Sequence, residues 1–172
     1  MCVVAANVNR FCPTRKNQIW AVVNEGYSLN EIRYTVAKTF FGRMCLSGDI
    51  AGLSKEKSVL VKQLVELYKK TAYILKDDEN YYFGDTDLKY RDLVGEQAVL
   101  KVAADGSGAL IIAHGFKDAK PITICNERLL GLEVTDVISS SNASITCEKG
   151  GITIFTEDFD AVVIHLKGKQ NK

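Results

Sequence analysis

The residues best placed to do chemistry form a short run of small and acidic side chains: Ser47, Gly48 and Asp49. They follow residues 44–46, a short apolar run bounded by turn residues, which predicts a buried strand. In parallel α/β folds, ligands bind at the carboxyl ends of the strands. Ser47, Gly48 and Asp49 are therefore candidate binding residues, with the alternative that Asp49 only satisfies the loop backbone.

Two other groups of carboxylates lie later in the chain. Residues 77–79 form an acidic run, which we interpret as a linker turn between domains. Asp85 and Asp87 have a spacing compatible with calcium, but the glycine and distal glutamate of an EF-hand are absent. Hydrolysis by two carboxylates needs a pair that faces across the substrate. No such pair can be assigned, so we expect no catalytic residue in this chain.

The cysteines and histidines do not indicate a metal or thiol site. The chain has five cysteines, an odd number, and they are scattered without a CxxC motif, unlike zinc sites or disulfide frameworks. We interpret them as free thiols in a reducing cytoplasm. A catalytic thiol would need a histidine partner, and His114 and His165 both lie in strand-like runs. We therefore expect no metal and no cofactor.

Trp20, the single tryptophan, lies in the mostly apolar run 17–23. An aromatic face can stack on a sugar ring, so Trp20 is a possible sugar platform. Packing in the core is the interpretation that we favour.

Length and composition are those of an ordinary globular protein. The chain has 172 residues, of which 47% are hydrophobic and 25% charged, and its formal net charge is +1. That charge gives no field to attract nucleic acid or an anionic membrane. No apolar run reaches the roughly 20 residues of a membrane span, and the N-terminus lacks the basic start of a signal peptide. We therefore expect a cytoplasmic protein that binds neither nucleic acid nor membrane.

The first half predicts helices around one strand. A capping box at Ser28 and Glu31 begins a helix over 29–42. Its apolar face would carry Ile32, Val36, Phe40 and Phe41 at helical spacing. After the strand at 44–46, Ser54 caps a second helix over 54–75. This order is one helix–strand–helix stretch of a parallel α/β fold, whose single strand needs partners from elsewhere.

The second half predicts an antiparallel β-sandwich. Short apolar runs recur between glycine-rich turns, including hairpin turns at 105–108 and 148–151. The expected fold class is α+β: a short α/β segment, residues 1–77, followed by an antiparallel β-sandwich, residues 78–172. The expected strands are 81–83, 98–103, 109–114, 122–125, 132–134, 144–147, 152–155 and 161–166.

Three stretches of the first half resemble the end of the catalytic barrel in α-galactosidases of glycoside hydrolase families 27 and 36. They are residues 9–18, residues 39–50, and Leu53 with Ser54. In these families an asparagine–glutamine pair begins a helix, and a small-residue strand ends near an aspartate. The second half, with residues 129–132 and 152–155, is similar to the family's C-terminal β-domain.

The resemblance implies retaining hydrolysis of terminal α-galactosides by an aspartate nucleophile and an aspartate acid/base. Both come from earlier barrel strands in the family, and a full barrel needs roughly 250 residues. The resemblance thus implies a C-terminal part, inactive alone, with Ser47, Gly48 and Asp49 at the rim of the sugar pocket. The alternative is a non-catalytic β-sandwich module that binds carbohydrate or protein. We also expect self-association through the first half, because its apolar helix face would lack a partner.

Overall fold

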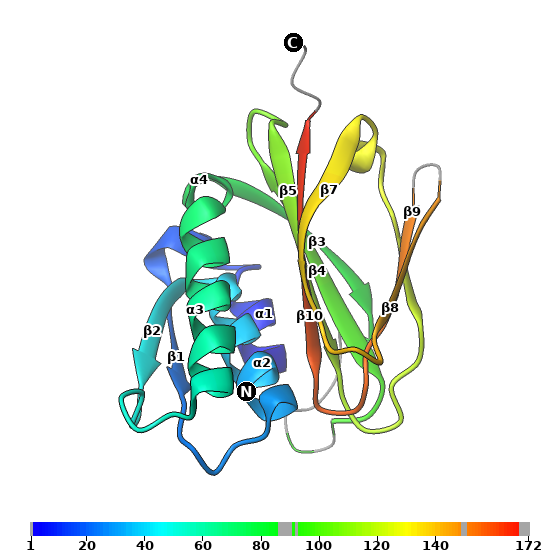
Figure 1. Cartoon of the computed structure of the whole chain (residues 1–172). Coiled ribbons are helices and arrows are strands. Elements are labelled where there is room, and N and C mark those ends of the chain that lie inside the picture. The colour runs from blue at the N-terminus through cyan, green and yellow to red at the C-terminus, as the bar shows by residue number, and fades with distance from the viewer. Residues whose placement is uncertain (1, 86–90, 92, 149–150, 169–172) are drawn as a thin grey trace.

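The computed structural model describes residues 2–85, 91, 93–148 and 151–168 in three layers. Helices and a small parallel sheet cover one face of a five-stranded antiparallel sheet, and a three-stranded sheet covers the other (Figure 1). The antiparallel sandwich and the α+β class that the sequence predicts are confirmed. None of the described helices is long and apolar enough to cross a membrane.

The sandwich contains each of the eight strands expected from the sequence. Its five-stranded sheet has the order β3-β4-β5-β10-β7, and its three-stranded sheet has the order β6-β9-β8. The hairpin between β4 and β5 turns at Gly106, whose φ is +71°. The middle of the other expected turn, 149–150, lies outside the described residues. The strand bounds are β3 Asp78–Gly84, β4 Glu96–Ala103, β5 Gly108–Gly115, β6 Ile122–Cys125, β7 Leu132–Ile138, β8 Ser144–Glu148, β9 Gly151–Phe155 and β10 Ala161–Gly168.

The central strands of the five-stranded sheet are buried on both faces, because layers lie on either side of them. In β4, β5 and β10, alternate residues such as Val99, Ile112 and Val163 pack toward the helices. The residues between them, such as Leu100 and Ile111, pack toward the three-stranded sheet. One of the two large core clusters therefore draws residues from both halves of the chain.

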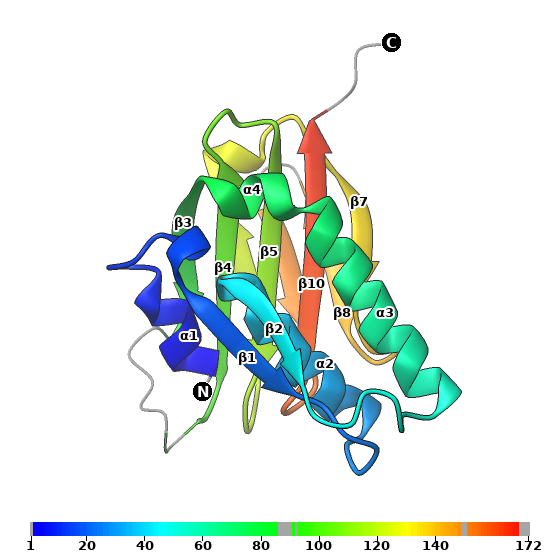
Figure 2. The same ribbon diagram turned by 90° about the vertical axis from the view of Figure 1, so that its left-hand side faces the viewer.

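The first half contains two strands where the sequence predicted one. The run that includes Trp20 forms β1, which pairs in parallel with β2 from Ile19↔Met44 to Val22↔Ser47. Figures 1 and 2 show this pair on the helical side of the large sheet, with helices between the pair and that sheet. The elements of this half are α1 Cys2–Val8, η1 Thr14–Lys16, β1 Gln18–Val22, α2 Leu29–Ala37, η2 Lys38–Phe41, β2 Arg43–Ser47, α3 Lys55–Lys70 and α4 Ala72–Lys76.

The helix predicted over 29–42 is shorter and better covered than expected. Its capping box is present, but the α-helix ends at Ala37 and continues as the 3-10 turn η2. Ile32, Val36, Phe40 and Phe41 are all 1% exposed or less. The prediction that this face lacks a partner is wrong, since the face packs into the core that the two halves share.

The helix predicted over 54–75 is two helices, α3 and α4, separated at Thr71. Thr71 turns its hydroxyl back to the carbonyl of Leu67, at 2.9 Å, as expected where a helix bends or ends. Ser54 does occupy the N-cap position of α3, but its side chain makes no capping hydrogen bond. The N–H of Ser54 instead donates to Glu25, a residue outside the helix.

The acidic run 77–79 is not a linker turn, because Asp78 and Glu79 begin β3. The Asp78 carboxylate accepts a 2.7 Å bond from the fully buried Lys101 ammonium and a 2.8 Å bond from the Thr14 hydroxyl. Asn80 also accepts from Lys101, at 2.6 Å. This network ties η1 to the large sheet. The boundary between residues 77 and 78 stays a prediction.

Candidate functional site

The candidate site is the edge at which β1 and β2 end together. Since the strands are parallel and Val22 pairs with Ser47, their carboxyl ends open onto the same edge (Figure 2). The Val23 N–H extends the pairing by donating to the Ser47 carbonyl, at 2.9 Å. The two strands thus bring the loop after Val23 beside Ser47, Gly48 and Asp49, which the sequence singled out.

Gly48 is required by the backbone at this edge. Its φ is +97°, in the left-handed region that favours glycine. A Cβ at this position would also collide with the carbonyl oxygen of Val23. The chain can therefore cross the end of β1 closely only with glycine here, which fixes Ser47 and Asp49 on either side of it.

Asp49 is exposed and closes its own loop. Its Oδ1 accepts a 3.0 Å hydrogen bond from the Gly52 N–H. That bond is the backbone-satisfying role that the sequence left open as the alternative to ligand binding. A turn of this kind also holds a carboxylate in a fixed position at the strand end, where it can accept hydrogen bonds from hydroxyl groups.

A second carboxylate, Glu25, lies beside this edge and was not found from the sequence. Its Oε2 accepts a 2.8 Å bond from the Ser54 N–H, and its Oε1 lies 2.9 Å from the Lys57 ammonium. The backbone bond from Ser54, followed by the bond from Lys57, lowers the pKa of Glu25. Glu25 therefore caps α3 from a loop 29 residues away, a separation at which no local sequence signal exists.

The outward face of the β1–β2 pair carries Trp20. Alternation directs Ile19 and Ala21 toward the core, while Trp20 and Val22 are 56% and 50% exposed. The favoured interpretation of Trp20 as a core residue is therefore wrong. In the register, Trp20 lies beside Cys45 and Val22 beside Ser47, so the exposed face is continuous with the candidate edge.

The remaining reactive residues do not form a metal or thiol centre among the described residues. No group of three or more His, Cys, Asp or Glu side chains there could hold an ion. The cysteines are unpaired thiols in this structure. His114 is fully buried against Tyr34 and Phe41, and burial lowers its pKa to about 3. Asp87, from the calcium-like spacing, lies outside the described residues.

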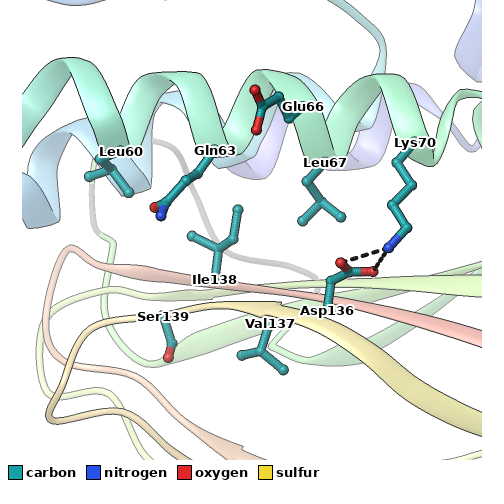
Figure 3. A pocket seen from close by; sticks show the side chains of 9 residues that line it. All are labelled: Leu60, Gln63, Glu66, Leu67, Lys70, Asp136, Val137, Ile138 and Ser139. Atoms are coloured by element: carbon teal, nitrogen blue, oxygen red, sulfur yellow. Dashed lines mark hydrogen bonds and ion pairs between the residues drawn. The ribbon is translucent and has the colours of Figure 1, made fainter.

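A groove between α3 and β7 holds the second polar cluster (Figure 3). In it the Lys70 ammonium donates to both Asp136 oxygens, at 2.7 and 2.6 Å. Asp136 Oδ2 also lies 2.8 Å from Nδ1 of the buried His165. The cavity is about 530 Å³ and is lined by Leu60, Gln63, Glu66, Leu67, Lys70, Asp136, Val137, Ile138 and Ser139.

A β-bulge creates this cluster. The pairing of β7 with β10 shifts between His165 and Leu166, leaving Thr135 as the extra residue. Two residues of a bulged strand then oppose one, so Thr135 and Asp136 both reach His165 Nδ1, at 2.9 and 2.8 Å. Burial raises the pKa of Asp136, but the bonds from Lys70, His165 and Thr135 outweigh it and hold the pKa at about 2.

Comparison with solved structures finds the same fold in parts of α-galactosidase chains. The chain has the fold of part of a family 36 α-galactosidase, with 97% of its length superposing on the galactosidase domain of an α-galactosidase–sucrose kinase at a TM-score of 0.66 and 12% identity. An α-galactosidase of Geobacillus stearothermophilus, solved with raffinose, covers 98% of the chain at a TM-score of 0.60 and 19% identity. An α-galactosidase of Lactobacillus brevis covers 90%, at 0.59 and 16%.

The chain spans about a quarter of the length of these α-galactosidase chains, 24%, 25% and 22% respectively. The sequence itself matches no family model and no curated protein. The likeness is therefore one of fold. It agrees with the resemblance seen in the sequence, which joined a barrel end to a β-sandwich.

Proposed function

We propose that this chain is the C-terminal part of an α-galactosidase-like glycoside hydrolase and that it supplies the last two β/α units of the barrel. The observation that carries the proposal is the parallel β1–β2 pair with its exposed face. Each strand is followed by a helix, as in a (β/α)₈ barrel. A parallel sheet is normally covered on both faces, yet this pair leaves Trp20 and Val22 in solvent.

In the intact enzyme, Ser47, Gly48 and Asp49 would line the rim of the sugar pocket. Active sites of (β/α)₈ barrels lie at the carboxyl ends of the strands, where these residues stand beside the end of β1. The hydroxyl of Ser47 and the carboxylate of Asp49 can hydrogen-bond sugar hydroxyls. The pair of carboxyl groups that performs retaining hydrolysis, about 5 Å apart, would come from the rest of the barrel.

The exposed face of β1 and β2 would contact that remainder of the barrel. In a chain without it, two copies could cover Trp20 and Val22 on each other. We therefore still propose self-association through the first half. The surface that would mediate it is the exposed face of β1 and β2, and not the face of the helix over 29–42 that the sequence suggested.

The alternative of a stand-alone binding module gains no support from the described aromatic residues at the start of the sandwich. A sugar-binding sandwich face needs exposed rings, and the cluster at its start does not offer them. Tyr82 lies under the Arg10 guanidinium, 4.1 Å from the ring centroid, and Phe83 packs between the two sheets. Tyr90, the last member of that cluster, lies outside the described residues.

The test compares this chain with the native protein, captured from its own cells by an antibody against the chain. We expect no hydrolysis of an aryl α-galactoside by the purified chain, because it holds no assignable carboxylate pair. The captured protein should be a longer polypeptide or a complex, and it should hydrolyse the substrate. A captured protein of 19.0 kDa without that activity would overturn the proposal.

Variants of the native protein sharpen this comparison. Asp49→Ala should raise KM, and Trp20→Lys should abolish activity by disturbing the contact with the rest of the barrel. Val94→Lys, at another position that is about half exposed, is the matched control and should leave activity unchanged.

A further inference from the structure

A polar cavity of about 380 Å³ lies between the segment that joins α1 to β1 and the start of β3. Residues of both segments line it, among them Asn9, Arg10, Phe11, Arg15, Asp77 and Asp78. The first segment enters β1 at Gln18, so this loop cavity lies toward the amino end of the strand, whereas Ser47, Gly48 and Asp49 lie beside its carboxyl end (Figure 2). The loop cavity is therefore separate from the candidate edge.

Defined contacts hold the two walls of the loop cavity together. The Thr14 hydroxyl donates to the Asp78 carboxylate, at 2.8 Å. The Arg15 guanidinium donates to the Lys76 carbonyl, at 3.0 Å, and lies 3.6 Å from the Asp77 carboxylate. These contacts tie the segment after α1 to the start of β3. The loop cavity is thus formed by the fold before any ligand arrives, as most ligand pockets are.

Asn9 gives the loop cavity an unused capacity for hydrogen bonding. Its Nδ2 and its Oδ1 are both buried, and neither has a hydrogen-bond partner among the described residues. Folded proteins pair nearly all of their buried polar groups, so such an amide needs a partner that the chain does not supply. A small rotation of the side chain would turn the amide into the loop cavity, which Asn9 lines. A bound molecule there could donate to Oδ1 and accept from Nδ2.

The charges that line the loop cavity cancel, since Arg10 and Arg15 balance Asp77 and Asp78. A phosphate or carboxylate ligand would meet the aspartates, and an ammonium ligand would meet the arginines. Guanidinium groups only donate hydrogen bonds, and ionised carboxylates only accept them, whereas a hydroxyl group does both. A neutral ligand with several hydroxyl groups therefore fits this lining best.

Phe11 adds an apolar platform to the polar lining. Its side chain is 85% exposed, more than any other large hydrophobic residue that the structure describes. The C–H groups on one face of a pyranose ring can pack on an aromatic ring while the sugar hydroxyls reach polar neighbours. Ligand pockets measure roughly 300–1,000 Å³, so the loop cavity has room for the end of an oligosaccharide and not for a long stretch of one.

We propose that the loop cavity binds a neutral saccharide, with Phe11 under a sugar ring and Asn9 and Arg10 hydrogen-bonded to its hydroxyl groups. The site would hold carbohydrate at the end of β1 opposite to the candidate edge, and it would break no bond. Since binding can be measured on the chain itself, this inference does not depend on the proposed enzymatic function.

The experiment titrates the purified full chain with raffinose, maltotriose and cellotriose at millimolar concentrations. Saturation-transfer NMR detects binding, and calorimetry gives the Kd. We expect binding of at least one of these trisaccharides, and Asn9→Leu and Phe11→Ala should each raise its Kd about tenfold, the effect of losing one net contact. Two controls should leave the Kd unchanged: Asp49→Ala at the candidate edge, and Phe159→Ala at another exposed ring, 45% exposed.

Each outcome decides the proposal. It is overturned if none of the trisaccharides binds, if binding survives both Asn9→Leu and Phe11→Ala, or if Asp49→Ala removes it. Thermal unfolding checks each variant, and Asn9→Leu should lose no stability because it removes two unpartnered polar atoms. Phe11→Ala changes an exposed side chain, so it decides the proposal if Asn9→Leu alters the fold. The assay reads binding and not hydrolysis, so its failure leaves the proposed glycosidase function standing.

Discussion

At the scale of single residues, the buried Lys101–Asp78 ion pair joins the large sheet to Thr14 in the first half of the chain. Lys101 lies in a strand run whose alternation looks ordinary, yet its ammonium is fully buried. Asp78, Thr14 and Asn80 surround it. From the sequence, the acidic run predicted a linker at Asp78. The lysine that neutralises Asp78 lies 23 residues later, and no local pattern connects the two residues.

Replacing Lys101 by Met should destabilise the protein by about 3–5 kcal/mol, because Asp78 would keep a buried charge without its partner. Chemical denaturation monitored by fluorescence of Trp20 measures this loss. Converting both residues, Lys101→Met with Asp78→Leu, should recover most of it, since an apolar replacement of the pair leaves no uncompensated charge. Equal losses in the single and double variants would contradict the role of the pair.

His114 should make stability depend on pH. Its pKa falls from the ordinary 6.5 to about 3 on folding, chiefly through burial. Between these values the unfolded chain binds a proton that the folded chain does not. Stability is therefore fully present above pH 6.5 and is lost as pH falls, with a slope of up to about 1.4 kcal/mol per pH unit.

Urea denaturation between pH 6.5 and 5, above most carboxylate titration, tests this pH dependence. His114→Phe should flatten the slope, since a phenyl ring packs against Tyr34 and Phe41 without titrating. The slopes are compared, and not the absolute stabilities, because the larger ring changes the packing as well. An unchanged slope would assign the pH dependence to other groups.

At the scale of elements, the sequence predicted most strands and helices but not their partners. The eight sandwich strands follow from short apolar runs between glycine-rich turns, which are a local signal. The parallel strand β1 was missed, because the run around Trp20 is apolar without clear alternation. The split of the long helix at Thr71 was also missed, because the apolar periodicity continues through this residue. The hydrogen bond from the Thr71 hydroxyl to the Leu67 carbonyl, which accompanies the split, is not visible in that periodicity.

The residues of the candidate site also divide into those with a local sequence signal and those defined by contacts between distant segments. Ser47, Gly48 and Asp49 were found because glycine and aspartate after a short apolar run are a local signal. The role of Glu25 as the cap of α3, and the burial of His165 beside Asp136, depend on contacts between distant segments. No pattern within one segment encodes those contacts.

Helix α3 should contribute to stability through its inner face. Leu64 is 0% exposed and belongs to the core shared by both halves, so Leu64→Ala should cost about 2–5 kcal/mol in thermal or chemical unfolding. Val59, 47% exposed on the same helix, is the matched control, and Val59→Ala should change stability by less than about 0.5 kcal/mol. A similarly small effect at Leu64 would mean that α3 does not pack as described.

At the scale of the whole molecule, the sequence favours two domains, and their independence can be tested directly. The composition changes near residue 77, and a sandwich with its own strands could fold alone. The packing argues differently, because Val99, Leu110 and Val163 bury their side chains against the helical layer. A chain of residues 78–172 would expose that entire face of the large sheet.

We therefore expect a chain of residues 78–172 to bind a hydrophobic dye and to unfold without a sharp transition. Full-length protein under the same conditions serves as the control. Cooperative unfolding of the shortened chain, with no dye binding, would show that the sandwich is a self-sufficient domain and that the predicted boundary is real.

The place of β10 in the sheet also has a consequence for biosynthesis. This strand is the last of those described, yet it lies between β5 and β7 and contacts both core clusters. While a ribosome is still making the segment after β9, β5 and β7 have no strand to join them. The large sheet and both core clusters of the nascent protein therefore stay incomplete until residues 161–168 leave the exit tunnel. If translation stops before residue 161, the released chain lacks β10 and cannot complete the sheet. Such a chain would be degraded by cellular proteases.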